Sequence, residues 1–163
     1  MATGQNINTY FQGTWHKGNA AVISAADHGA WLGSNVFDGA RYFDGVAPDL
    51  LAHCNRVNNS AEALMLKPTV SAKEMVDIVW EGLKLYPADA AVYIRPMYWA
   101  IDGDISAIVP KSETVGFAIC LEEFPLAPET ATVRLLSLIH ISEPTRPERI
   151  ADGVVVVKKK RGG

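Results

Sequence analysis

The residues best able to bind an anionic ligand lie in segment 90–100. Arg95 alternates there with three large side chains, Tyr93, Met97 and Trp99. Because alternate residues of a β-strand share one face, the Tyr93 hydroxyl would lie beside the Arg95 guanidinium. A buried guanidinium needs a counter-charge, either an internal Asp or Glu or the carboxylate of a ligand. The pattern leaves both alternatives open.

Arg56 is a second candidate anion-binding residue, and it lies on a predicted helix. Its neighbours on the helical wheel are small: Ala52, Ser60 and Ala63. Another surface could therefore approach it closely. A solvent-exposed charge is the simpler interpretation on spacing alone, and an anion-binding role needs further support. Phe37, on a predicted strand, is interpreted either as a core residue or as the wall of a pocket.

Other residue patterns predict no nucleophile, phosphate loop or metal site. Asp27 and His28 could form an acid–base pair, but adjacent loop residues usually point apart, and Asp27 could instead cap a turn. Cys54 and Cys120 are far apart in the sequence and lack metal-ligand spacing. We interpret them as reduced core thiols of a cytoplasmic protein. The sequence contains no Gly-x-Gly-x-x-Gly, P-loop or Gly-x-Ser-x-Gly motif.

Two helices are predicted to support these residues. Apolar residues at helical spacing predict a helix over about 49–66, with its core stripe at Leu50, Cys54, Val57, Ala61 and Leu64. A capping box at 71–74 predicts the start of a second helix that ends near residue 86.

Strands account for the rest of the predicted domain. They are expected within 8–24 around a turn at 17–19, and at 34–43, 90–100 and 114–121. Asp44-Gly45 predicts a tight hairpin turn. Pro96 has no backbone donor, so its strand must meet a bulge or lie at an edge. We therefore predict one α+β domain, with about six strands and two helices, over residues 1–123.

The bulk composition excludes several classes of protein. The 163 residues are 48% hydrophobic and carry a net charge of −3. That charge gives no general attraction to nucleic acid or to an anionic membrane. The N-terminus has no apolar signal core, and no stretch approaches the ~20 apolar residues of a membrane span. We expect a cytoplasmic protein with no nucleic-acid partner and no membrane partner.

The character of the sequence changes near residue 135. Phe124-Pro125-Leu126-Ala127-Pro128 is typical of an extended segment, and an interdomain linker is predicted over 124–135. From Leu136 the chain reads Leu-Ser-Leu-Ile-His-Ile-Ser-Glu-Pro-Thr-Arg, which resembles a translated sequencing adapter. Residues 136–163 are accordingly predicted to be a disordered, non-native tail, and the gene-derived protein is expected to end near residue 135.

Several blocks in the same order resemble the class IV aminotransferases, which are the fold-type IV pyridoxal-phosphate enzymes. They are Asp-His at 27–28, Leu-Gly-Ser-Asn-Val-Phe-Asp-Gly-Ala-Arg at 32–41, His-Cys-Asn-Arg-Val at 53–57 and Ala-Val-Tyr-Ile-Arg-Pro at 91–96. The branched-chain amino acid aminotransferases are the most similar group. The resemblance implies that residues 1–123 are the small N-terminal domain and that the large domain is missing. It also implies a full-length homodimer that binds pyridoxal 5'-phosphate between its domains.

The same resemblance implies roles for individual residues. Arg56 matches the arginine that binds the cofactor phosphate. Tyr93 and Arg95 match residues near the substrate carboxylate, and Phe37 matches a wall of the substrate side-chain pocket. The implied substrates are an amino acid, branched-chain by this resemblance, and a 2-oxo acid. Leu32 stands where a branched-chain enzyme often has tyrosine, which leaves other amino acids or amines open.

No residue of this chain matches the Schiff-base lysine of the family. Five lysines lie within 17–111 at positions that do not match, and the lysines at 158–160 have different neighbours. No catalytic residue is therefore assigned, and the chain alone is predicted to be an inactive fragment. A lyase similar to the aminodeoxychorismate lyases and a non-catalytic dimerisation module are the alternatives.

Overall fold

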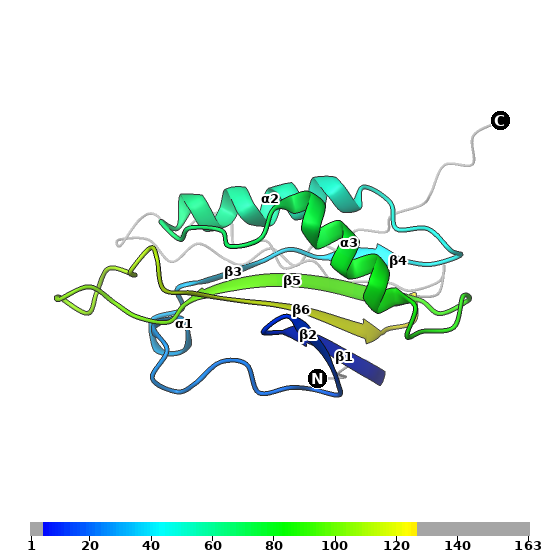
Figure 1. The fold of residues 1–163 in the computed structure, drawn as a ribbon, viewed down its shortest axis with the longest axis horizontal. Coiled ribbons are helices and arrows are strands. Elements are labelled where there is room, and N and C mark those ends of the chain that lie inside the picture. Colours follow the sequence, from blue (N-terminus) through cyan, green and yellow to red (C-terminus); the bar gives the residue numbers. More distant parts are fainter. Residues whose placement is uncertain (1–4, 127–163) are drawn as a thin grey trace, which may run out of the picture. The chain divides into compact units, whose positions relative to one another are not determined.

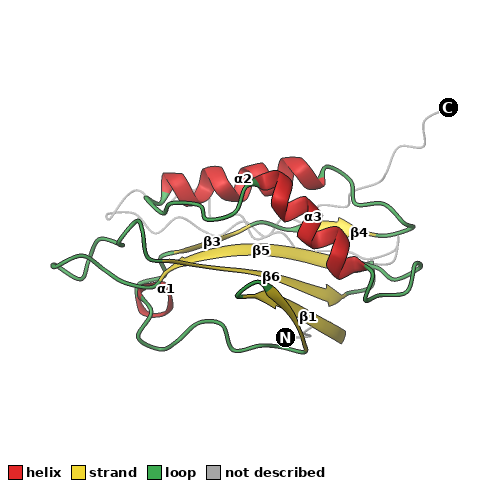
Figure 2. Ribbon diagram, viewed as in Figure 1, coloured by secondary structure: helices red, strands yellow, loops and turns green. Residues whose placement is uncertain are grey.

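Within residues 5–126, the part of the chain that this computed structural model describes, six antiparallel strands form one sheet. The strands are β1 (Gln5–Phe11), β2 (Thr14–Lys17), β3 (Asn35–Phe37), β4 (Ala40–Tyr42), β5 (Val92–Ala100) and β6 (Val115–Glu123). The helices are α1 (His28–Trp31), α2 (Leu50–Ala63) and α3 (Ala72–Leu83). Helices α2 and α3 both cover one face of the sheet (Figure 1). The predicted α+β class is confirmed, with α1 as an additional single turn (Figure 2).

The strand order places β5 and β6 at the centre of the sheet. The order is β2-β1-β6-β5, and β3 and β4 pair one after the other along the remaining edge of β5. The predicted strands 90–100 and 114–121 correspond to β5 and β6. None of the helices in residues 5–126 is long and apolar enough to cross a membrane.

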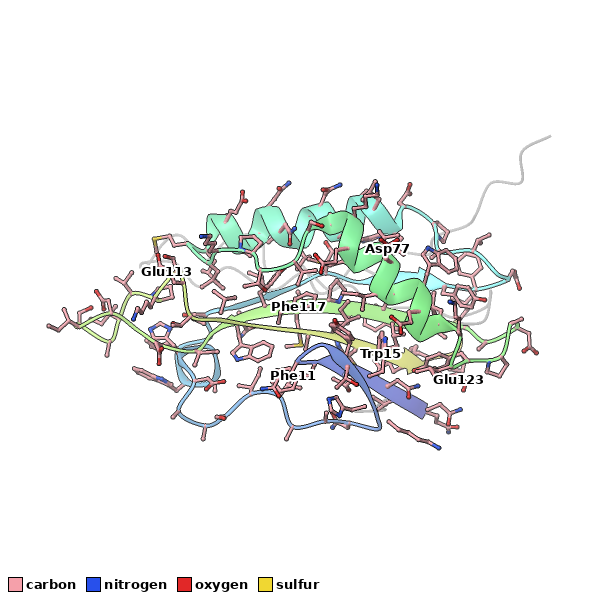
Figure 3. The ribbon with its side chains drawn as sticks, viewed as in Figure 1. Phe11, Trp15, Asp77, Glu113, Phe117 and Glu123 are labelled. Carbon is pink, nitrogen blue, oxygen red and sulfur yellow. The ribbon has the colours of Figure 1, made fainter. Side chains whose placement is uncertain are left out.

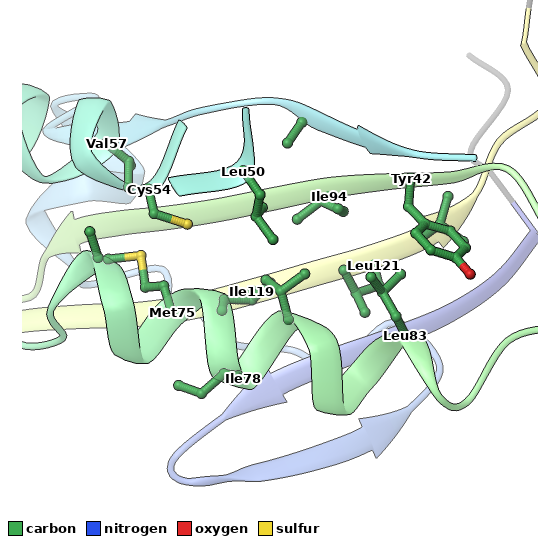
Figure 4. Close-up of a cluster of buried hydrophobic side chains, with 14 of the residues drawn as sticks. Tyr42, Leu50, Cys54, Val57, Met75, Ile78, Leu83, Ile94, Ile119 and Leu121 are labelled. Atoms are coloured by element: carbon green, nitrogen blue, oxygen red, sulfur yellow. The ribbon is translucent and has the colours of Figure 1, made fainter. Parts of the chain in front are cut away.

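The hydrophobic core lies between the two long helices and the sheet (Figure 4). Four residues of the predicted α2 stripe are buried, Leu50, Cys54, Val57 and Ala61, and Leu64 packs against them in part. The facing residues of α3 and of the central strands include Met75, Ile78, Leu83, Ile94, Ile119 and Leu121. Burial of an aliphatic side chain of this size contributes about 1.5–3 kcal/mol, so this layer stabilises the domain.

The start of α3 is as predicted. The Ser71 hydroxyl accepts a hydrogen bond from the Glu74 backbone N–H at 3.2 Å, which satisfies one of the free donors at the helix N-terminus. Helix α2 begins differently, because its N-cap residue Asp49 has a left-handed backbone with φ 53° and makes no side-chain cap.

The N-terminal hairpin corrects one prediction. The strands β1 and β2 are joined at Gln12 and Gly13, whose φ values are 51° and 81°, and not at the predicted turn over 17–19. Gly18 also has a positive φ of 93°, but it ends β2, where its N–H donates to the Ile7 carbonyl at 2.7 Å. Both sites use a glycine with positive φ, so composition alone does not separate the turn from the strand end.

The predicted strand over 34–43 is interrupted. It forms β3 and β4, separated by Asp38 and Gly39, and the two strands pair with different parts of β5. The interruption lies opposite Pro96, whose carbonyl accepts from the Asp38 N–H at 3.1 Å. Pro96 has no N–H to donate, so the neighbouring segment between β3 and β4 lacks one hydrogen bond of the ladder and stops pairing there. The irregularity that Pro96 predicts is therefore present, while β5 itself is a central strand. The tight turn at Asp44 and Gly45 is confirmed by φ values of 49° and 78°.

The sheet face opposite the helices carries a second set of aromatic side chains. Phe11 lies on this side (Figure 3), and its ring stacks on that of Trp99 with centroids 6.1 Å apart. Trp99 is 1% exposed and lies opposite Gly116 in the ladder. Gly116 has no side chain, and this leaves room for the indole above β6.

Candidate functional site

Alternation along β5 directs its candidate residues to the face opposite the helices. Val92, Ile94 and Tyr98 are fully buried in the core under α2 and α3. Tyr93 and Arg95, between them in the sequence, therefore project from the other face. The predicted strand placed these two side chains on one face, and the structure agrees.

Arg95 and Phe37 line the same cavity, which has a volume of about 370 Å³. Phe37 pairs with Met97 across β3 and β5, so both side chains reach this face. Phe37 is 60% exposed, which excludes the interpretation as a core residue in this domain and favours that of a pocket wall. The remaining lining is mixed, with Thr9, Asn19, Ala20, Val22, Asn35, Ala118 and Cys120.

Arg95 has an internal counter-charge. One of its terminal nitrogens lies 3.5 Å from the Glu122 carboxylate and 3.5 Å from the Cys120 sulfur. Burial would lower the pKa of Arg95, but the Cys120 hydrogen bond and the Glu122 charge outweigh burial, and the pKa is raised. The ion pair expected as one alternative is therefore present. Since Arg95 also lines the cavity and its side chain is 35% exposed, a ligand carboxylate can still approach it.

Tyr93 lies between two guanidinium groups. Its ring centroid is 5.5 Å from the central carbon of Arg95 and 5.3 Å from that of Arg41. A Cβ at Gly39 would overlap the Tyr93 hydroxyl, so the glycine leaves space for this ring. Arg41 itself donates to the Phe124 carbonyl at 2.7 Å. The cross-strand pairing of Arg41 with Tyr93 places this arginine beside the predicted residues, and periodicity alone could not reveal it.

Arg56 lies on the helix side of the sheet, in an ion-pair cluster with Asp38 and His53. Its Nε donates to one Asp38 carboxylate oxygen at 2.5 Å, and a terminal nitrogen donates to the other at 2.8 Å. The His53 Nδ1 lies 2.7 Å from the same carboxylate. Asp38 is 6% exposed whereas the Arg56 side chain is 62% exposed, so the carboxylate is the buried partner.

The charges within this cluster stabilise one another. Burial would raise the pKa of the Asp38 carboxyl, but hydrogen bonds from Arg56, His53 and the Gly39 N–H outweigh burial and lower it. The hydrogen bond and charge of Asp38 raise the pKa of Arg56. Both groups therefore remain charged throughout the physiological pH range. The sequence provided the i, i+3 spacing of His53 and Arg56, but the position of Asp38 depends on the β3–β4 interruption.

Asp27 and His28 do not form an acid–base pair. The Asp27 carboxylate accepts from the Ser24 N–H at 3.1 Å, as expected for a turn cap, and from the Trp99 indole N–H at 2.9 Å. His28 is buried and its Nδ1 lies 2.8 Å from the Ser34 hydroxyl. Among the residues described, no group of three or more His, Cys, Asp or Glu side chains could hold a metal ion.

Comparison with known families identifies the chain. The sequence pattern of the amino-transferase class IV family matches residues 35–153, a range that contains both arginine sites and the cavity wall at Phe37. The chain belongs to the class IV aminotransferases. The match extends into residues 136–153, which were predicted to be a non-native tail; that tail and most of the predicted 124–135 linker lie outside the described residues.

Individual relatives agree with this assignment. An aminotransferase from Brucella abortus, solved with the cofactor PLP, has 46% sequence identity and a TM-score of 0.77 over 78% of this chain and 46% of its own. An inferred branched-chain-amino-acid aminotransferase of Methanocaldococcus jannaschii is 36% identical over 61% of this chain and 34% of its own length. The branched-chain amino acid aminotransferase of Escherichia coli, at 19% identity and a TM-score of 0.66, shares the fold. The chain spans about a third of the curated relatives and just under half of the solved proteins.

Proposed function

We propose that this chain is the small-domain part of a pyridoxal-phosphate-dependent aminotransferase that transfers an amino group between a branched-chain amino acid and a 2-oxo acid. Family membership and the cofactor-bound Brucella abortus aminotransferase support the reaction class. The observation that carries the proposal is the pair of guanidinium sites: Arg56 is exposed and held by Asp38, and Arg95 lines a cavity with Phe37. They provide one site for a phosphate and one for a carboxylate.

The Arg56 cluster suits the phosphate of pyridoxal 5'-phosphate. Two nitrogens of the guanidinium are engaged by Asp38, while its third nitrogen has no protein partner among residues 5–126. Its two N–H groups can donate to a phosphate oxygen, as guanidinium groups commonly do. When bound, the cofactor supplies an electrophilic carbonyl and a ring that withdraws electrons from the substrate.

The cavity suits an amino acid with an apolar side chain. Arg95, whose guanidinium lies next to the Tyr93 ring, would bind the substrate carboxylate and would hold the 2-oxo acid in the same way. Phe37, Met97 and Val22 line the cavity and would contact the substrate side chain. Binding at these points orients the α-carbon and excludes water from it. We propose a cytoplasmic homodimer as the full-length form.

The 163-residue chain alone is proposed to be inactive. Pyridoxal-phosphate enzymes use a lysine that bonds to the cofactor and moves the substrate proton. Within the described residues, the lysines lie at 17, 67, 73, 84 and 111, and none of them lines the cavity with Arg95. Measurable amino transfer by this chain would contradict this part of the proposal.

The reaction is tested on the gene extended beyond codon 135. We expect amino transfer from leucine, isoleucine or valine to 2-oxoglutarate, measured by coupled oxidation of NADH. Release of pyruvate from aminodeoxychorismate would instead show the lyase reaction. A product with neither activity would indicate a non-catalytic module. An Asp77→Asn variant is a suitable control, since Asp77 is exposed on the outer side of α3 (Figure 3).

A further inference from the structure

We infer that Asp38 is a positioning residue that sets the guanidinium of Arg56 for a phosphate ligand. The inference rests on the proposed function of Arg56 and extends it to a second residue. It concerns the orientation of the guanidinium, which is determined by the contacts of Asp38, and not the charge of Arg56 alone.

Asp38 is itself fixed before it contacts Arg56. Its backbone N–H donates to the Pro96 carbonyl at 3.1 Å, and its carboxylate accepts from the Gly39 N–H at 2.7 Å. The side chain is 6% exposed, so it has little freedom to reorient. The anchor of the pair is therefore the carboxylate on the sheet.

Arg56, in contrast, would be mobile without this anchor. Its side chain is 62% exposed, and long charged side chains keep many rotamers when solvated. The two-point contact, Nε at 2.5 Å and a terminal nitrogen at 2.8 Å, fixes the plane of the guanidinium and the direction of its remaining nitrogen. Ordering this group before a phosphate arrives lowers the entropy lost on binding.

His53 lies one helical turn before Arg56 and also restricts the movement of the Asp38 carboxylate. Its Nδ1 lies 2.7 Å from the Asp38 oxygen and 2.9 Å from the Arg56 terminal nitrogen. When that Nδ1 carries its proton, the donor is directed to Asp38, because Arg56 offers no acceptor. The carboxylate then accepts from three neighbours, and rotation that would release Arg56 is opposed.

Orientation and charge predict opposite effects when the carboxylate is removed. Asp38→Asn leaves the cluster more positive, so charge alone predicts tighter binding of a phosphate. If orientation dominates, the same change weakens binding, because an amide has only one acceptor oxygen and cannot hold the two Arg56 nitrogens on separate oxygens. The sign of the change in affinity therefore distinguishes the two.

The test uses the 163-residue chain with inorganic phosphate as the probe. Binding is followed by the ¹⁵N–¹H signal of the Arg56 Nε, identified by its loss in Arg56→Ala. In the wild type we expect this signal to be protected from solvent exchange and to shift saturably with phosphate. In Asp38→Asn we expect loss of protection and at least a five-fold weaker affinity, followed by phosphorus-31 line broadening. Asp77→Asn, with the same change of charge at an exposed site, should match the wild type.

Arg56→Lys provides a second test at an exposed position. It keeps the positive charge but cannot make the two-point contact, so its affinity should also fall at least five-fold. Unchanged or tighter binding in Asp38→Asn, or unchanged binding in Arg56→Lys, would overturn this inference while the proposed phosphate role of Arg56 survives. Wild-type affinity in Arg56→Ala, or no saturable binding by the wild type, would overturn that role and this inference together.

Discussion

Replacing Gly116 with alanine should destabilise the domain by about 1.5–5.5 kcal/mol. A Cβ at this position would lie inside the contact distance of three atoms of the Trp99 indole. The indole cannot withdraw freely, because it is 1% exposed and stacks on Phe11. Its N–H also donates to the Asp27 carboxylate at 2.9 Å.

The expected magnitude combines three contributions. Overpacking a filled core costs about 1–3 kcal/mol. If the ring shifts, the hydrogen bond to the charged Asp27 is lost as well, which costs about 1.5–3 kcal/mol. Alanine recovers about 0.4–1 kcal/mol, because it reduces the conformational entropy of the unfolded chain. The losses exceed the gain across these ranges.

Gly82→Ala is the matched comparison. A Cβ at Gly82 would meet the Trp15 indole and Leu121, but Trp15 is only partly buried, and the atom of the buried Leu121 that it meets is the end of a flexible side chain. Alanine is also favoured over glycine by about 1 kcal/mol in a helix interior. Urea unfolding followed by far-UV circular dichroism should therefore show a smaller loss for Gly82→Ala than for Gly116→Ala. A Gly116→Ala protein as stable as the wild type, or losses of equal size in the two variants, would refute the packing described for Trp99.

Three further outcomes follow from the titrating and hydrogen-bonded groups. The pKa of Asp38 is lowered in the folded state, so Asp38 stabilises the fold above the usual carboxyl pKa, and this stabilisation is lost as pH falls through the folded pKa. In an acid titration, the free energy of unfolding of Asp38→Asn should therefore fall less steeply than that of the wild type. The Tyr98 hydroxyl donates to the Val70 carbonyl at 3.1 Å and accepts from the Val70 N–H at 3.2 Å. Tyr98→Phe should therefore cost about 1–3 kcal/mol in urea unfolding, and equal midpoints would contradict it. Burial raises the pKa of Cys54 to about 11, so a disulfide reagent at pH 8 should modify the partly exposed Cys120 quickly and Cys54 only on unfolding. Rapid modification of both cysteines in the folded protein would contradict this prediction.

The helices and central strands could be predicted because the spacing of residues along each element indicates its type and its buried face. The α2 stripe and the Ser71 cap follow directly from spacing along the chain. The candidate face of β5 was equally accessible, since alternation alone separates Arg95 from the core. These are properties of single elements and need no information about neighbours.

Contacts between elements could not be predicted in this way. The pairing of Asp38 with Arg56 depends on where β3 leaves the sheet, and the approach of Arg41 to Tyr93 depends on the β4–β5 pairing. The N-terminal turn was misplaced for a similar reason, because Gly13 and Gly18 offer the same backbone freedom. Pairing of β1 with β2, in which Phe11 lies opposite Thr14, makes Gly13 the glycine that joins two strands.

Because Pro96 has no backbone N–H, its position also distinguishes one alignment of β3 along β5 from another. A displacement of β3 along β5 by one residue would place a different N–H opposite the proline and would exchange the faces of every β3 side chain. In the observed alignment, Phe37 points toward the cavity and Asp38, one peptide bond later, points toward α2. The proposed substrate wall and the proposed phosphate-binding site therefore depend on two adjacent residues of the chain. A shift in alignment would move both side chains to the wrong face of the sheet, so the two positions cannot change independently of each other.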